Sequence, residues 1–162
     1  QYVRNIRDSL AEIDPAGADD YTKNAEAYIQ QLTDLDLWIE AQVAVIPLQE
    51  RILITNHESF GYFADRYQFQ MIGTVLPGVS TDAAPSAQQM ANLINLISAS
   101  GAKAIFIEIG ANPQLAEQIA GETGVTVVTQ VRTHSLSAPG GDAPTYIEMM
   151  KHNTAIIVDA LR

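Results

Sequence analysis

The stretch from Thr55 to Phe63, which reads TNHESFGYF, decides the fold. The short apolar run before it, Ile52 to Thr55, is rich in β-branched residues and is typical of a buried strand. Phe60 and Phe63 recur at the spacing of one helix face. His57 therefore stands between a strand and a helix, where the ligand crevice of an open α/β sheet lies. The position suits a metal ligand, because neutral imidazole is the commonest metal donor, but it also suits a histidine that caps the helix.

Beyond residue 50 the chain alternates short apolar runs with helical patterns. The runs predict strands over residues 52–55, 69–75, 104–109 and 125–129. The helical patterns cover residues 59–67, Pro85 to Gly101, Asn112 to Gly124 and 145–161, and Pro77-Gly78 predicts a turn. We therefore expect an α/β fold with a four-stranded, mostly parallel sheet flanked by helices.

Two helices are expected before the sheet. The first, over residues 1–13, ends at Asp14 because a residue before proline avoids the helical region. The second starts at Asp19 or Asp20 and carries an apolar heptad seam to about Pro47. The seam favours one long helix along a domain and leaves a coiled coil open as the alternative. We accordingly divide the chain into residues 1–47, the two helices, and residues 48–162, the α/β part.

Composition excludes several classes of protein. The 162 residues, 47% hydrophobic and 17% charged, suit one globular core. The net charge of −10 argues against nucleic acid as a partner and suits contact with cations. The absence of cysteine excludes thiolate metal sites, disulfides and cysteine nucleophiles. No apolar run reaches the roughly 18 residues of a membrane helix, and the chain opens at Gln1 inside a helical pattern, so we expect a fragment or a processed chain.

Two histidines, His57 and His134, follow the ends of two different predicted strands. If those strands are close, both imidazoles reach one crevice, and nitrogens that share a Zn²⁺ ion must lie roughly 3–3.5 Å apart. Glu108 needs a partner because it stands in an apolar strand. It can orient a ligating imidazole or accept a hydrogen bond from a loop amide. His152 is expected at the surface.

Enzyme motifs are incomplete in this chain. His57-Glu58 begins like a zinc-protease motif, but Gly61 stands where the second histidine is required. Ser59 has no G-x-S-x-G elbow around it, and Gly140-Gly141 lacks the remaining residues of a phosphate loop. A metal-dependent hydrolase that activates water at an open coordination position stays the alternative function.

Five stretches together resemble the metal-binding receptors of ABC transporters for zinc and manganese, a cluster that includes adhesin-type lipoproteins. In order along the chain they are Ala11 to Pro15, Asn24 to Tyr28, Thr55 to Phe63, Ile107 to Pro113, and Pro144 to Tyr146 with Met149-Met150. The resemblance covers essentially the whole chain. It implies two α/β lobes joined by a long helix, with the ion held between the lobes. This chain would carry the bridging helix, roughly residues 19–45, and the C-terminal lobe.

The resemblance also implies a ligand set. His57 and His134 would each bind the ion, and a missing N-terminal lobe would supply two further ligands. The family usually has Asp where His134 stands, so here the chain departs from it. An imidazole in place of a carboxylate suits Zn²⁺ better than Mn²⁺, and we expect Zn²⁺ first with Mn²⁺ as the alternative.

The implied function is capture of a divalent metal ion, without catalysis, for import through the membrane permease of an ABC transporter. The resemblance places such a receptor in the periplasm or outside the cell, with a lipid anchor in the missing N-terminal part. Apolar positions on the two N-terminal helices are expected to be exposed, which predicts self-association. No residue here bears on adhesion.

Overall fold

The computed structural model describes residues 1–76 and 85–162. Contacts within the chain divide it into two compact units, Gln1–Glu40 and Ala41–Arg162. The domain boundary expected at residue 47 stays a prediction. In the parts of the chain that the structure describes, every helix is too short or too polar to serve as a membrane-spanning segment.

The first unit consists of two helices and the turn that joins them. The elements are α1 (Tyr2–Ile13), a 3-10 turn (Pro15–Gly17) and α2 (Ala18–Val43), which continues past the end of the unit. The helix α1 ends at Asp14, which leaves the helical region with φ −129° because a proline follows. The Tyr21 hydroxyl donates a hydrogen bond of 2.8 Å to Asp14. A Cβ atom at Gly17 would lie 2.8 Å from the Tyr21 ring, so a larger residue there would displace this ring and its hydrogen bond to Asp14.

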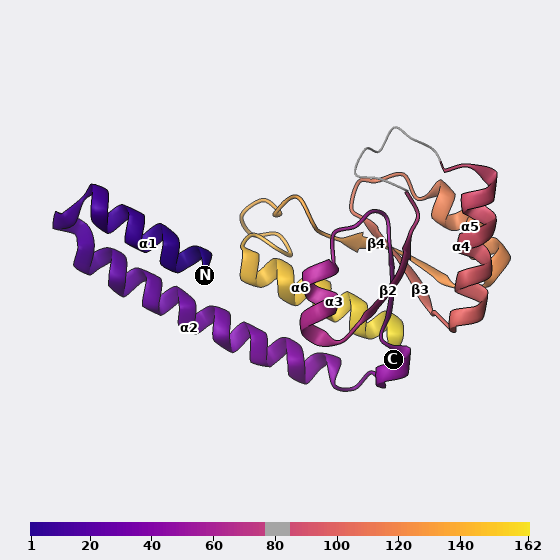
Figure 1. The fold of residues 1–162 in the computed structure, drawn as a ribbon, viewed down its shortest axis with the longest axis horizontal. Coiled ribbons are helices and arrows are strands. Elements are labelled where there is room, and N and C mark those ends of the chain that lie inside the picture. The colour runs from indigo at the N-terminus through magenta and orange to yellow at the C-terminus, as the bar shows by residue number, and fades with distance from the viewer. Residues whose placement is uncertain (77–84) are drawn as a thin grey trace. The chain divides into compact units, whose positions relative to one another are not determined.

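The second unit, residues 41–162, is an α/β domain that we call the lobe (Figure 1). Its strands are β1 (Ile52–Thr55), β2 (Gln70–Thr74), β3 (Ala104–Glu108) and β4 (Thr126–Val131). Its helices are α3 (Gly61–Tyr67), α4 (Ala87–Ser100), α5 (Gln114–Thr123) and α6 (Tyr146–Leu161), after a 3-10 turn (Leu48–Glu50). The predicted α/β class is confirmed.

The four described strands form one sheet in the order β2-β1-β3-β4, and every neighbouring pair is parallel. The chain adds β2 on one side of β1 and then returns to place β3 and β4 on the other side. The strand order therefore reverses between β1 and β3. In open α/β sheets the ligand crevice lies at such a switch point, outside the carboxyl ends of the strands.

Helices cover both faces of the sheet. Figure 1 shows α4 and α5 on one side and α3 and α6 on the other. The core against α4 and α5 joins strand residues such as Ile54 and Ile105 to Ile97 of α4 and Ile119 of α5. The two central strands, β1 and β3, therefore read as apolar runs because both of their faces are buried, whereas the outer strands β2 and β4 are partly exposed.

Some predicted element ends were wrong. Pro85 was expected to open a helix, but the N-cap of α4 is Ser86, whose hydroxyl accepts a hydrogen bond of 3.3 Å from the Gln89 amide. The Gln89 side chain accepts one of 2.8 Å from the Ser86 amide, and this capping box is a stronger start signal than proline. The predicted helix ends at Gly101 and Gly124 are confirmed, with φ of 72° and 77°.

Three further boundaries differ by a few residues. The helix expected from Ser59 begins at Gly61, because Phe60 has a non-helical backbone with ψ 14°. Strand β4 continues to Val131, two residues beyond the expected end, because its ladder with β3 extends to the pair Glu108–Val131. The long helix ends at Val43 instead of near Pro47. The predicted turn at Pro77-Gly78 lies outside the described residues.

Candidate metal centre

Three side chains from three neighbouring strands meet at the switch point of the sheet. His57 follows β1, Glu108 is the last residue of β3, and His134 lies just beyond the end of β4. Because β3 lies between β1 and β4, the carboxylate of Glu108 stands between the two histidines. The parallel direction of the strands brings all three residues to the same edge of the sheet.

The distances between these groups suit a single ion. His57 Nε2 lies 3.3 Å from Glu108 Oε2. His134 Nδ1 lies 2.9 Å from Oε1 and 3.1 Å from Oε2 of the same carboxylate. The two imidazole centroids are 5.0 Å apart, and one donor atom from each of the three residues lies within 4.8 Å of the others. The separations of 2.9 to 3.3 Å between the carboxylate oxygens and the ring nitrogens are comparable to those of neighbouring donors on a tetrahedral Zn²⁺ with bonds of about 2 Å.

The backbone at His57 is fixed by two hydroxyl groups. Thr55 and Ser59 donate hydrogen bonds of 2.8 and 3.3 Å to the His57 carbonyl. The residue itself is buried, with 6% of its surface exposed. Its Nδ1 atom is buried too and has no hydrogen-bond partner among the described residues. The ring therefore presents only Nε2 to the crevice.

Glu108 is held by groups from the loop after β4. Its Oε1 atom accepts hydrogen bonds from the Thr133 hydroxyl at 2.6 Å and from the His134 amide at 3.1 Å. Burial raises the pKa of Glu108, but the hydrogen bonds from Thr133, His134 and His57 outweigh it and lower the pKa from 4.5 to about 2. Glu108 is therefore a carboxylate at neutral pH. Sequence reasoning missed Thr133, whose role becomes visible only once β3 and β4 are paired.

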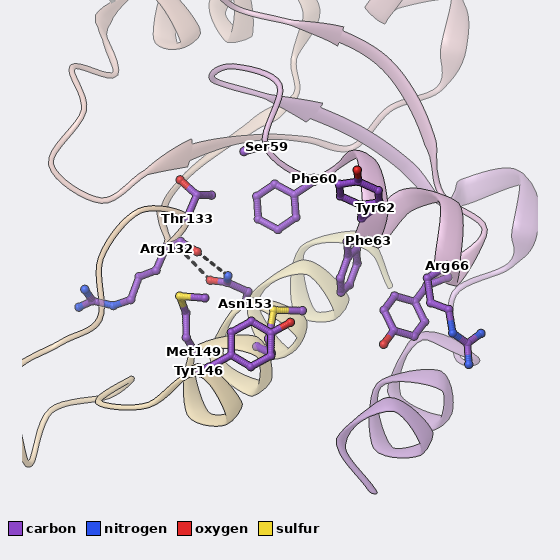
Figure 2. Close-up of a pocket in the computed structure, with 12 residues that line it drawn as sticks. Ser59, Phe60, Tyr62, Phe63, Arg66, Arg132, Thr133, Tyr146, Met149 and Asn153 are labelled. Atoms are coloured by element: carbon purple, nitrogen blue, oxygen red, sulfur yellow. Dashed lines mark hydrogen bonds between the residues drawn. The ribbon is translucent and has the colours of Figure 1, made fainter. Parts of the chain in front are cut away.

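The end of β4 is held by side chains of α6. The buried amide of Asn153 accepts a hydrogen bond of 2.9 Å from the Arg132 amide and donates one of 2.7 Å to the Arg132 carbonyl (Figure 2). His152 donates one of 2.9 Å to the carbonyl of Gln130. We call these contacts the α6 clamp. They satisfy backbone groups of Gln130 and Arg132 at the end of β4, which is an edge strand of the described sheet.

The expectation that His152 is an exposed surface residue was wrong. Its side chain is only 18% exposed and also lies 3.6 Å from Asp142. Asp142 pairs with Arg132 at 3.0 Å, which ties together the two ends of the loop that carries His134. Burial raises the pKa of Asp142, but the neighbouring Arg132 guanidinium outweighs it and lowers that pKa. One signal for the clamp was available, because Asn153 interrupts the apolar face of a predicted helix.

A pocket of about 360 Å³ (Figure 2) is lined by sequence neighbours of the two histidines, but none of the three residues is part of its wall. Aromatic and methionine side chains of α3 and α6 form most of its wall, including Tyr62, Phe63, Tyr146 and Met149. Ser59 and Thr133, neighbours of the two histidines, form part of its edge. The crevice at the switch point therefore has an apolar flank.

Comparison with known proteins gives a consistent match. The sequence model of a family described as "ZnuA: Zinc-uptake complex component A periplasmic" matches residues 1–160. The manganese-binding lipoprotein MntA of Halalkalibacterium halodurans is 34% identical over 99% of this chain and 53% of its own length. The zinc-binding protein TroA of Treponema pallidum is 34% identical over 98% of this chain and 53% of its own.

Solved structures agree with the sequence comparison. A Mn-bound mutant of a periplasmic metal-binding protein from Candidatus Liberibacter asiaticus superposes with a TM-score of 0.88 and 29% identity. The match covers 99% of this chain and 59% of that one. The chain thus spans about half the length of the curated relatives it matches.

Proposed function

The chain belongs to the family of zinc-uptake complex component A, and from that premise we propose that it is the metal-capturing lobe of a receptor for a divalent ion. His57 and His134 bind the ion in this proposal. The observation that carries it is the meeting of these two imidazoles at the switch point of the sheet, with ring centroids 5.0 Å apart. No catalysis is part of the function.

Zn²⁺ is the expected ion, with Mn²⁺ as the alternative. Two imidazoles favour Zn²⁺, whereas carboxylate oxygens favour Mn²⁺. Relatives named for each metal support this range, since TroA is named as zinc-binding and MntA as manganese-binding. The net charge of −10 also favours the approach of a cation.

The proposed role in transport is based on the family and on the match to only about half the length of its relatives. The ion would be held between this lobe and a second lobe, and would be passed to the membrane permease of an ABC transporter. The apolar pocket beside the site offers a surface on which a second lobe can pack. A location in the periplasm or outside the cell agrees with relatives named as lipoproteins or as periplasmic.

Calorimetric titration of Zn²⁺ into the chain and its variants tests the proposal. His57→Ala and His134→Ala should each weaken Zn²⁺ binding by more than about tenfold, because each removes a ligand. Glu117→Gln is the control, since it changes an exposed carboxylate of α5 that belongs neither to the site nor to the α6 clamp. Equal Zn²⁺ binding by the parent chain and both alanine variants would refute the proposal.

The alternative, a metal-dependent hydrolase, has one observation in its favour. Two imidazoles and a carboxylate around one point form a donor set that can leave a position open for water. Ester and phosphate hydrolysis assays with and without a chelator separate the two functions. Turnover that the chelator abolishes, and that His57→Ala also abolishes, would favour the enzyme.

A further inference from the structure

The carboxylate of Glu108 has two oxygens with different surroundings. Oε1 accepts hydrogen bonds from the Thr133 hydroxyl at 2.6 Å and the His134 amide at 3.1 Å. Both donors belong to the loop after β4, and they fix the carboxylate in place. Oε2 lies 3.3 Å from His57 Nε2 and 3.1 Å from His134 Nδ1, and the latter nitrogen also lies 2.9 Å from Oε1. Oε1 is thus anchored by the loop, and Oε2 is the oxygen that contacts both imidazoles.

A carboxylate that only orients a metal-binding imidazole contacts one ring nitrogen and leaves the other for the ion. His57 does not allow this division. Its Nδ1 atom is buried and finds no partner in the described residues, so an ion arriving from the crevice cannot reach it. The nitrogen that is left for the ion is Nε2, and Nε2 is the atom that faces Glu108. An ion on Nε2 therefore lies against Oε2 as well.

We propose that Glu108 is itself a metal ligand, through Oε2, so that the lobe supplies two imidazole nitrogens and one carboxylate oxygen. This inference rests on the proposed function. The separations of 3.1 and 3.3 Å between Oε2 and the ring nitrogens match the spacing of neighbouring donors around a tetrahedral ion. Two imidazoles and one carboxylate form a common three-ligand set for Zn²⁺, with the fourth position left for another donor.

The test compares the parent chain with Glu108→Gln and Glu108→His. Glutamine keeps the size of the side chain and a carbonyl oxygen for the Thr133 and His134 donors, but it is a poor ligand. The histidine of Glu108→His again offers an atom that can bind the metal ion. Zn²⁺ affinity is measured by competition with a chelating dye, and infrared difference spectra are recorded with and without Zn²⁺. Glu117→Gln, an exposed carboxylate in the first turn of α5, is the control for loss of one charge.

We expect Zn²⁺ to shift a carboxylate stretching band in the parent chain, and we expect Glu108→Gln to lack that shift. The Gln variant should bind Zn²⁺ at least about tenfold more weakly, and Glu108→His should recover part of the loss. Far-UV circular dichroism of the metal-free variants checks that the fold is retained. Glu117→Gln should bind Zn²⁺ as tightly as the parent chain and show the same shift of the carboxylate band.

Two different results would overturn the inference. If Zn²⁺ binds through His57 but shifts no Glu108 carboxylate band, or if Glu108→Gln binds as tightly as the parent, Glu108 is not a ligand and the proposed function still stands. If the parent takes up no Zn²⁺, or if His57→Ala binds it equally well, the proposed function fails and the inference fails with it.

Discussion

Glu108 is a partly buried carboxylate whose charge depends on its neighbours. Hydrogen bonds from Thr133, His134 and His57 lower its folded-state pKa to about 2, below the ordinary value of 4.5. A lowered folded pKa means that the group stabilises the fold above pH 4.5, and that this contribution is lost as the pH falls toward 2.

Glu108→Gln should therefore destabilise the metal-free chain by about 2 kcal/mol at neutral pH, the usual value of hydrogen bonds to a charged group. The difference from the parent should shrink as the pH is lowered from 4.5 toward 2. Urea unfolding at a series of pH values measures it. A difference that stays constant across this range would show that the charge of Glu108 has no part in stability.

The resemblance to metal receptors implies Asp at the position of His134, so this residue is the place to test which ion the lobe prefers. His134→Asp should raise Mn²⁺ affinity relative to Zn²⁺ by about tenfold, or about 1.4 kcal/mol, since a carboxylate replaces an imidazole and adds a negative charge. Parallel competition titrations with Mn²⁺ and Zn²⁺ measure the ratio of the two affinities. His134→Asn, which adds no charge, separates the effect of charge from that of losing the ring.

Sequence reasoning found the residues whose types are unusual for their places. His57 and His134 follow strand ends, and Glu108 is a charge in an apolar run. It missed Thr133 and Asn153, because their partners depend on which strands are neighbours and on which helix covers the edge of the sheet. Hydrophobic periodicity carries no information on either point.

At the scale of elements, the α6 clamp holds the backbone at the point where the chain leaves β4. Asn153→Ala should destabilise the chain by about 2–3 kcal/mol, because it leaves the amide and carbonyl of Arg132 without their buried partner. It should also weaken Zn²⁺ binding, because Arg132 lies two residues before His134.

A double-mutant comparison separates the clamp's effect on the site from a general loss of stability. If His134 is a ligand as proposed, Asn153→Ala should cause little further loss of Zn²⁺ affinity in the His134→Ala background, since the side chain that it positions is already absent. Asn153→Asp can still accept a hydrogen bond from the Arg132 amide. Its Zn²⁺ affinity should therefore lie between those of the parent chain and Asn153→Ala. Equal losses of affinity in both backgrounds would mean that the clamp does not act through His134.

The type of most elements was predictable, whereas their ends and their order were not. Apolar runs and glycines at helix ends identified the described strands and helices. The start of α4 was misplaced because Ser86 and Gln89 form a capping box that overrides the signal of Pro85. The order β2-β1-β3-β4 arises from packing between distant segments, which local patterns do not encode.

At the scale of the whole molecule, the first unit leaves apolar surface uncovered. Helix α1 has no buried residue, and its apolar side chains recur at spacings of three or four residues along one face. Those exposed are Tyr2 (86%), Ile6 (59%), Leu10 (41%) and Ile13 (81%). Monomeric soluble proteins rarely expose so continuous a stripe. We therefore expect the chain to associate with itself through α1, in a manner that depends on concentration.

Sedimentation velocity over a wide range of concentration tests this expectation. A shift to larger species at high concentration should be strongly reduced by Ile13→Glu, because a buried charge without a partner opposes association. Leu96→Glu is the matched control, since Leu96 is an apolar residue of α4 with 45% of its surface exposed. The control should associate as the parent does, because α4 presents no comparable stripe. A parent chain that stays monomeric at every concentration would show that the exposed face of α1 is tolerated in water without a partner.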